Sequence, residues 1–131
     1  MKRIPREDII VRDSMLLPFR GSELWGIELD SLSTHTEVAI EKFERDIKYA
    51  CRSSTTSKIA IHVKDTQLNH AFVTAIIVGL NSSDGNIRKV AFIGVEWLYK
   101  IKLSKLLRKS TTGIAFCFFR DYEKAKEWLI P

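Results

Sequence analysis

The chain has 131 residues, of which 45% are hydrophobic and 28% charged, and its formal net charge at pH 7 is +5. This length corresponds to about one domain that can bury a proper core. A run of about 18 consecutive apolar residues is absent, which excludes a membrane-spanning helix, and the basic start lacks the apolar segment of a signal peptide. The two distant cysteines, Cys51 and Cys117, follow no ligand spacing. We therefore expect small apolar thiol side chains and a cytoplasmic protein.

The first thirty residues predict an antiparallel hairpin. Its expected strands are residues 9–11 and 24–29, and residues 18–21, Pro-Phe-Arg-Gly, supply the turn. The apolar residues on one face of the second strand are Trp25, Ile27 and Leu29.

A helix is predicted from Thr34 to about Cys51. Thr34 and Glu37 have the spacing of a capping box, in which each side chain bonds a free amide of the first turn. The expected inner stripe consists of Ile40, Phe43, Ile47 and Ala50. The expected solvent face consists of Glu41, Lys42, Glu44, Arg45 and Lys48.

A strand over residues 58–63 and a helix over residues 71–80 are predicted next. In the strand, Ile59, Ile61 and Val63 face one way, and Ala60 and His62 face the other way. The helix is apolar nearly all round and is interrupted only by Thr74. Since a helix on a sheet surface usually has a polar outer side, another element of the chain covers this one, or it meets a partner or ligand.

The last forty residues predict strand, helix, strand and helix, over 89–95, 96–109, 114–119 and 121–129. So many alternating elements in so little chain favour a parallel sheet with helices on its faces. We therefore predict an α/β fold with four or five mostly parallel strands, about four helices and an N-terminal antiparallel hairpin.

The helix over 97–109 is strongly basic. Its positive residues are Lys100, Lys102, Lys105, Arg108 and Lys109. The simpler interpretation is a solvated outer face above an apolar inner one. The alternative is a surface that follows phosphates or an anionic membrane. Nucleic-acid readers usually add exposed aromatic residues or a recognised module, so a nucleic-acid partner is the less favoured interpretation.

The C-terminal third contains three characteristic stretches: 90–94 (Val-Ala-Phe-Ile-Gly), Trp97 and 119–129, which begin Phe-Arg-Asp and end Ala-Lys-Glu-Trp-Leu. In these residues the chain resembles the SpoIIAA-like proteins of the STAS superfamily. The order of elements is similar across nearly the whole chain. The resemblance implies a small sheet flanked by helices, over residues 1–131 as a single domain, that serves mainly to bind something.

The same resemblance implies a regulatory partner. Anti-sigma factor antagonists of this superfamily bind a regulatory kinase and are switched by phosphorylation of a Ser that follows an Asp at a helix start. Here Asn69 and His70 occupy those two positions, and Thr66 is a displaced hydroxyl. This departure leaves open whether Thr66 is phosphorylated. Other SpoIIAA-like proteins resemble carriers of lipid-like ligands, by analogy with the Sec14 fold, which would suit helix 71–80.

Reactive groups are sparse in the sequence. His62, Asp65 and His70 could meet at the carboxyl end of a strand, but their spacing matches no metal motif. There is no glycine-rich phosphate loop, no Gly-x-Ser-x-Gly and no Cys-x-x-Cys. We therefore predict a protein that is not an enzyme and that needs no metal or cofactor.

Our main functional prediction is a regulatory or interaction module that binds a protein partner, with a homodimer through helix 71–80 as one form of it. A carrier or sensor of a small apolar ligand is the alternative, and anion or nucleic-acid binding through residues 97–109 is the third. The predicted site residues are Asp65, Thr66, Asn69, His70, Phe72, Thr74, Ile76, Gly94 and Trp97. In this hypothesis Asn69 and His70 give polar contacts, and Phe72, Ile76 and Trp97 form apolar walls.

Overall fold

The computed structural model describes residues 11, 13–52, 57–82, 86–110 and 113–131. The strands are β1 (Met15–Phe19), β2 (Ser22–Glu28), β3 (Lys58–His62), β4 (Lys89–Ile93) and β5 (Ala115–Phe119). The helices are α1 (Thr36–Arg52), α2 (His70–Asn81), α3 (Trp97–Ser110) and α4 (Tyr122–Leu129). The five strands form one sheet in the order β1-β2-β3-β4-β5, in which β1 is antiparallel to β2 and the other pairs are parallel. The predicted α/β architecture is confirmed.

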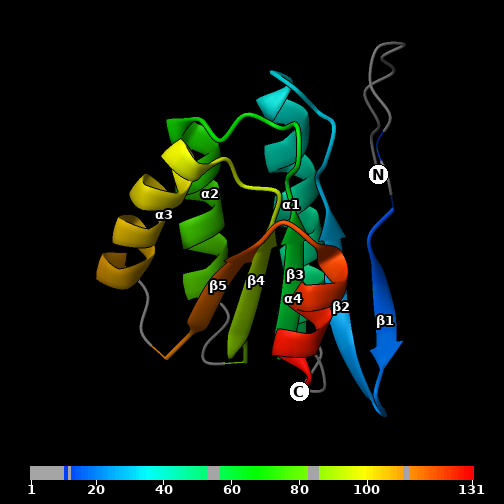
Figure 1. Ribbon diagram of the computed structural model, residues 1–131. Coiled ribbons are helices and arrows are strands. Elements are labelled where there is room, and N and C mark those ends of the chain that lie inside the picture. Colours follow the sequence, from blue (N-terminus) through cyan, green and yellow to red (C-terminus); the bar gives the residue numbers. More distant parts are fainter. Residues whose placement is uncertain (1–10, 12, 53–56, 83–85, 111–112) are drawn as a thin grey trace.

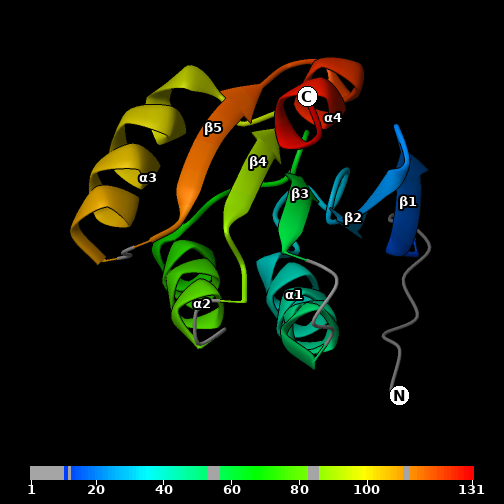
Figure 2. The same ribbon diagram turned by 90° about the horizontal axis from the view of Figure 1, so that it is seen from below.

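The helices lie on both faces of this sheet. Figure 2 shows α1 and α2 below it, α3 beside β5, and α4 on the opposite face. The strands follow one another in chain order and parallel crossovers are right-handed, so the three connecting helices share one face. The loops after the parallel strands consequently meet along a single edge (Figure 1). Within the described ranges no helix is both long enough and apolar enough to cross a bilayer.

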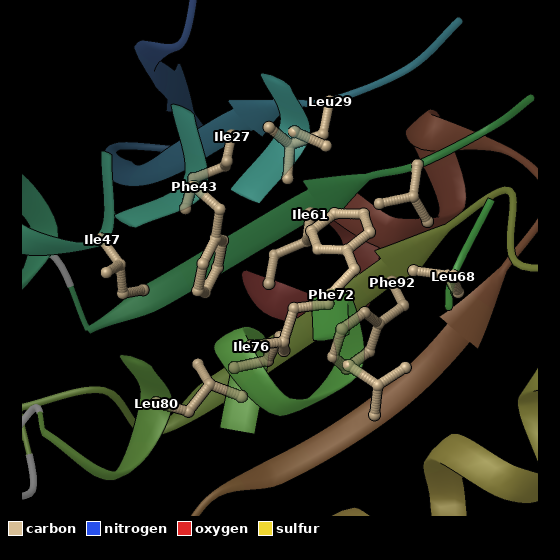
Figure 3. Close-up of a cluster of buried hydrophobic side chains, with 14 of the residues drawn as sticks. Ile27, Leu29, Phe43, Ile47, Ile61, Leu68, Phe72, Ile76, Leu80 and Phe92 are labelled. Carbon is tan, nitrogen blue, oxygen red and sulfur yellow. The ribbon is translucent and has the colours of Figure 1, made fainter. Parts of the chain in front are cut away.

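The main core fills the space between the sheet and its three connecting helices (Figure 3). Ile27, Ile61 and Phe92 point into it from the strands, and Phe43 and Phe72 meet them from the helices. All five side chains are fully buried. A smaller cluster under α4 consists of Leu24, Ala60, Ala91, Ile93, Ala125, Leu129 and Ile130. Because both faces of the sheet are covered, β4 has buried residues in consecutive positions instead of alternating ones.

The apolar helix predicted at 71–80 is covered mainly from within the chain. It corresponds to α2, which packs on the sheet with α1 on one side and α3 on the other. Its buried residues are Phe72, Val73, Ile76, Gly79 and Leu80. Val78 remains 62% exposed. Contacts with the sheet, α1 and α3 therefore explain why α2 is apolar nearly all round.

The first strand of the hairpin is not where the sequence predicted it. The partner of β2 is β1 at Met15–Phe19, and the connection is Arg20–Gly21 alone. Pro18 belongs to the strand, which is tolerated because β1 lies at the edge of the sheet. Residues 9 and 10 of the predicted strand lie outside the described residues, and Val11 packs against the core without joining a strand.

Helix α1 begins at Thr36, two residues after the predicted cap. The carbonyl of His35 accepts hydrogen bonds from the amides of Val38 and Ala39, so His35 occupies the position before the helix. The predicted capping box at Thr34 is therefore wrong, because the helix begins two residues later. On the inner stripe Phe43 and Ile47 are buried and Ile40 partly so, whereas the side chain of Ala50 lies outside the described residues.

The prediction that Lys42 lies on the solvent face of α1 is wrong. This residue is buried, with 4% of its surface exposed. Its ammonium donates to Asp46 Oδ2 at 2.7 Å and to Ser14 Oγ at 2.5 Å. Asp46 is also buried, and its main-chain carbonyl accepts from Trp25 Nε1 at 3.1 Å. The buried charge of Lys42 is tolerated because Asp46, its ionic partner, lies one helical turn away and the Ser14 hydroxyl accepts a further hydrogen bond.

Candidate functional site

A cleft of about 520 Å³ opens at the carboxyl ends of β3, β4 and β5. Its lining residues are Lys64, Asp65, Gly94, Val95, Glu96, Trp97, Lys100 and Arg120. The structure thus brings Asp65, Gly94 and Trp97, three of the predicted site residues, around one cavity, together with Lys100 of the basic helix. Open α/β sheets usually bind their ligands at this edge.

Gly94 determines how closely the loops approach each other beside this cleft. Its φ is +84°, and a Cβ atom built there would lie 2.6 Å from Lys64 Cβ and 2.7 Å from Lys64 Cα. Its amide donates to the carbonyl of Phe119 at 2.9 Å. Only glycine combines this backbone conformation with such close packing against another main chain. In the sequence, only the single glycine after β4 indicated this close approach between the loops.

A second, shallower hollow of about 300 Å³ adjoins the cleft. Its lining residues are Ser33, Thr34, Asp65, Thr66, Gln67, Glu96 and Tyr99, so it shares Asp65 and Glu96 with the cleft. The Ser33 amide donates to the Asp65 carbonyl, and the Gln67 amide donates to the Ser33 carbonyl, both at 2.8 Å. Ser31, Ser33 and Asp65 all have positive φ values of 53° to 60°. Such backbone strain clusters at functional sites, because the surrounding structure must hold it in place.

Two predicted site residues hold the loops together. The Thr66 hydroxyl is buried, accepts from the Leu32 amide at 3.0 Å and donates to the Leu29 carbonyl at 2.6 Å. Asn69 caps α2: its Oδ1 accepts from the Phe72 amide at 2.9 Å, and its Nδ2 donates to Thr36 Oγ1 at 3.0 Å. Both side chains therefore satisfy groups of the protein itself.

The other predicted residues separate into the core and the surface. Phe72 and Ile76, proposed as pocket walls, are fully buried in the main core, whereas Trp97 is 67% exposed. His70 and Thr74 are exposed on α2. The hypothesis of one apolar pocket between Phe72 and Trp97 is therefore not supported, because the core side chains of the sheet and helices pack around Phe72.

The outward side of α3 combines exposed apolar and basic side chains. Trp97, Leu98 and Ile101 are 67%, 64% and 54% exposed. The exposed basic residues of the helix are Lys102, Lys105, Arg108 and Lys109. Its inner side packs on the core through Leu103 and Leu107, and the helix contains no acidic residue. We call the exposed side, residues 97, 98, 101, 102, 105 and 108, the α3 surface.

A polar cluster that the sequence did not predict lies on the α4 side of the sheet. His62 Nδ1 lies 3.0 Å from Glu28 Oε1 and 3.9 Å from Asp30 Oδ1. The Tyr122 hydroxyl donates to Glu28 Oε2 at 3.0 Å. The side chains of Glu28, Asp30 and His62 are 13%, 7% and 17% exposed. We call these three residues the Glu-Asp-His cluster.

Ionisation in this cluster is shaped by burial and hydrogen bonding. Burial alone would raise the pKa of Glu28, but hydrogen bonds from His62 and Tyr122, with the positive charges of His62 and Lys42, lower it below its ordinary value of 4.5. Burial and the neighbouring Glu28 carboxylate raise the pKa of the Tyr122 hydroxyl. At neutral pH Glu28 is therefore ionised, and Tyr122 remains a hydrogen-bond donor.

The register of the sheet explains why this cluster forms. Glu28 pairs with His62 across the parallel β2 and β3, so both side chains leave the sheet on the same face. The predicted set of His62, Asp65 and His70 does not form, because His62 turns toward α4 while His70 begins α2 on the opposite face. The period-two pattern of each strand predicts that Glu28 and His62 lie on the face opposite its large apolar residues. The sequence does not show that these two strands are neighbours, so it could not predict that the two side chains meet.

The chain matches no protein-family model, no curated protein and no solved structure. The resemblance to SpoIIAA-like proteins therefore remains a prediction.

Proposed function

We propose that this protein is a non-catalytic interaction module of the STAS type, which binds an acidic protein partner through the α3 surface. The observation that supports this proposal most is the exposure of Trp97, Leu98 and Ile101 side by side on one helix. Large apolar side chains grouped at the surface are typical of interaction sites, and Trp is enriched among residues that dominate binding energy.

The charge of the α3 surface supports a partner of opposite charge. Lys102, Lys105 and Arg108 follow the apolar residues along the same helix, and no acid stands among them. An acidic amphipathic segment would place its apolar side on Trp97 and Ile101 and its carboxylates toward these cations. Such charge complementarity mainly accelerates association and selects the partner.

The cleft beside Trp97 supports the same location. Trp97 and Lys100 line it from α3, and Arg120 lines it from the loop after β5. A partner seated on the α3 surface could therefore insert one polar side chain into the cleft. We also propose the cytoplasm as the compartment in which this contact forms.

A site-specific crosslink tests this proposal in the cell that makes the protein. A photoreactive amino acid is placed at Leu98, and the control carries it at Lys124, which is exposed on α4. We expect a discrete polypeptide adduct from position 98 alone. The K102E/K105E/R108E variant should reduce that adduct at least tenfold while the melting temperature changes little, because the three side chains are exposed. Equal adducts at both positions, or an adduct that survives charge reversal, would contradict the proposal.

Binding to anionic membranes or nucleic acid is the second candidate function, because the α3 surface contains cations and no acid. Sedimentation with vesicles of anionic lipid, and retention on single-stranded DNA, distinguish it from the protein partner. If the K102E/K105E/R108E variant loses vesicle or DNA binding at physiological salt and the crosslink at position 98 yields no polypeptide, the second candidate replaces the first.

A further inference from the structure

The Glu-Asp-His cluster contains donor atoms of the kinds that bind metal ions. Glu28 and Asp30 each offer a carboxylate oxygen, and His62 offers an imidazole nitrogen. These atoms all lie within 4.8 Å of one another. They come from the carboxyl ends of the neighbouring strands β2 and β3 and the residues that follow. A rigid sheet therefore positions this donor set.

The spacing of the donor atoms fits a first-row metal ion. The nitrogen of His62 lies 3.0 Å from the Glu28 oxygen and 3.9 Å from the Asp30 oxygen. Two ligands that each lie about 2.1 Å from one ion are about 3.0 to 4.2 Å apart, depending on the angle between them. The three side chains would need only small rotations to place an ion among them.

Residues around the cluster fix the orientation of Glu28. The Tyr122 hydroxyl donates to Glu28 Oε2, and this leaves Oε1 turned toward His62. Gly26 makes this contact possible, because a Cβ at position 26 would lie 2.6 Å from the Tyr122 hydroxyl oxygen. The Glu28 amide also donates to Ser14 Oγ at 3.0 Å. Hydrogen bonds of this kind orient the ligands of metal sites and strengthen metal binding.

The surroundings favour a cation electrostatically. Glu28 and Asp30 direct two carboxylates toward the same small volume, and both side chains are at most 13% exposed. Attraction between unlike charges is stronger at such sites than in bulk water.

We propose that the Glu-Asp-His cluster is a binding site for a divalent transition-metal ion, and that zinc fits it best. His62 Nδ1, Glu28 Oε1 and Asp30 Oδ1 would be the ligands, and Nδ1 would release its proton when the ion binds. Zinc accepts one imidazole and two carboxylates, whereas magnesium and calcium prefer oxygen ligands alone. This proposal departs from the sequence-based expectation of no metal, and it is independent of the α3 surface.

Metal titration of the 131-residue chain tests the proposal. Protein freed of metal by a chelator is titrated with zinc chloride by calorimetry, and with cobalt chloride by visible absorption, which reports the ligands. We expect one ion per chain. H62A and D30N should each weaken binding at least tenfold, whereas the matched control H70A, which alters an exposed histidine outside the cluster, should bind like the parent protein.

Measurements on the unaltered protein keep the proposal testable if H62A or D30N fails to fold. Zinc should shift the nuclear magnetic resonance signals of the His62 ring and leave those of the exposed His70 ring in place. Unmoved His62 signals at saturating zinc would overturn the proposal. The proposal would also be overturned if folded H62A bound zinc with the affinity of the parent protein.

Discussion

At the scale of single residues, the carboxyl edge contains side chains with two different roles. Thr66 and Asn69 bind amides of the protein itself, so they position loops. Trp97 lies in solvent and is available to a partner. The sequence suggested all three as site residues, because polar and aromatic residues near strand ends look alike before the fold is known. Hydrogen-bond partners and exposure separate them.

Substitution of Gly94 should show how much this edge depends on one close contact. We expect G94A to lower the free energy of unfolding by about 2 to 4 kcal/mol, because it adds strain at positive φ and a clash with the main chain of Lys64. G113A is the matched control, since Gly113 also has a positive φ of +77° but has no atom within 4 Å of the added Cβ. It should cost only about 1 kcal/mol. Equal losses in urea denaturation would show that the contact with Lys64 contributes nothing.

At the scale of elements, the second half of the chain was predicted well. The strands and helices from β3 onward lie within two residues of their predicted bounds, because long apolar runs alternate there with clear turn residues. In α4, Ala125 and Leu129 are buried, with Tyr122 and Trp128 beside them, at the three- and four-residue spacing of one helix face. The first strand was missed because Pro18 and Phe19 resemble a turn in sequence. Only pairing with β2 reveals Met15–Phe19 as an edge strand.

The start of α2 permits a direct test of an element's cap. We expect N69A to lower the free energy of unfolding by about 1 kcal/mol, since the Phe72 amide loses its acceptor. N69D keeps an oxygen in place and should lose less than half as much. Thermal unfolding of both variants measures this difference. If N69D is as unstable as N69A, the link from Asn69 to Thr36 matters more than the cap.

At the scale of the whole molecule, Glu28 connects three separate elements. It lies on β2, contacts His62 on β3 and accepts from Tyr122 on α4. Because its pKa in the folded protein lies below the ordinary value of 4.5, ionised Glu28 stabilises the fold above that pH. This contribution is lost as the pH falls through the lowered value. Acidification should therefore weaken the docking of α4 and the stability of the sheet over the same pH range.

The pH dependence of global unfolding tests this connection, with a chelator present so that only protons exchange. We expect the free energy of unfolding of the parent protein to fall as the pH is lowered below the ordinary Glu28 pKa of 4.5, and E28Q to show a smaller fall. The control is E123Q, because Glu123 lies on α4 with its side chain 68% exposed. It should follow the parent curve. A fall in E28Q as steep as that of the parent would mean that other carboxylates govern acid unfolding.

The sequence by itself determined the α/β class, most elements and the face that each presents to the core, because these follow from the local spacing of apolar residues. It also named Asp65, Gly94 and Trp97 among the site residues, and these three line the cleft where the carboxyl ends of the parallel strands meet. Only the tertiary structure decided which polar groups face one another. Glu28 and His62 are 34 positions apart, and their contact depends on strand order and register, which no local pattern encodes. The same dependence placed Lys42 inside and Trp97 outside, because neighbouring elements, not composition, determine burial.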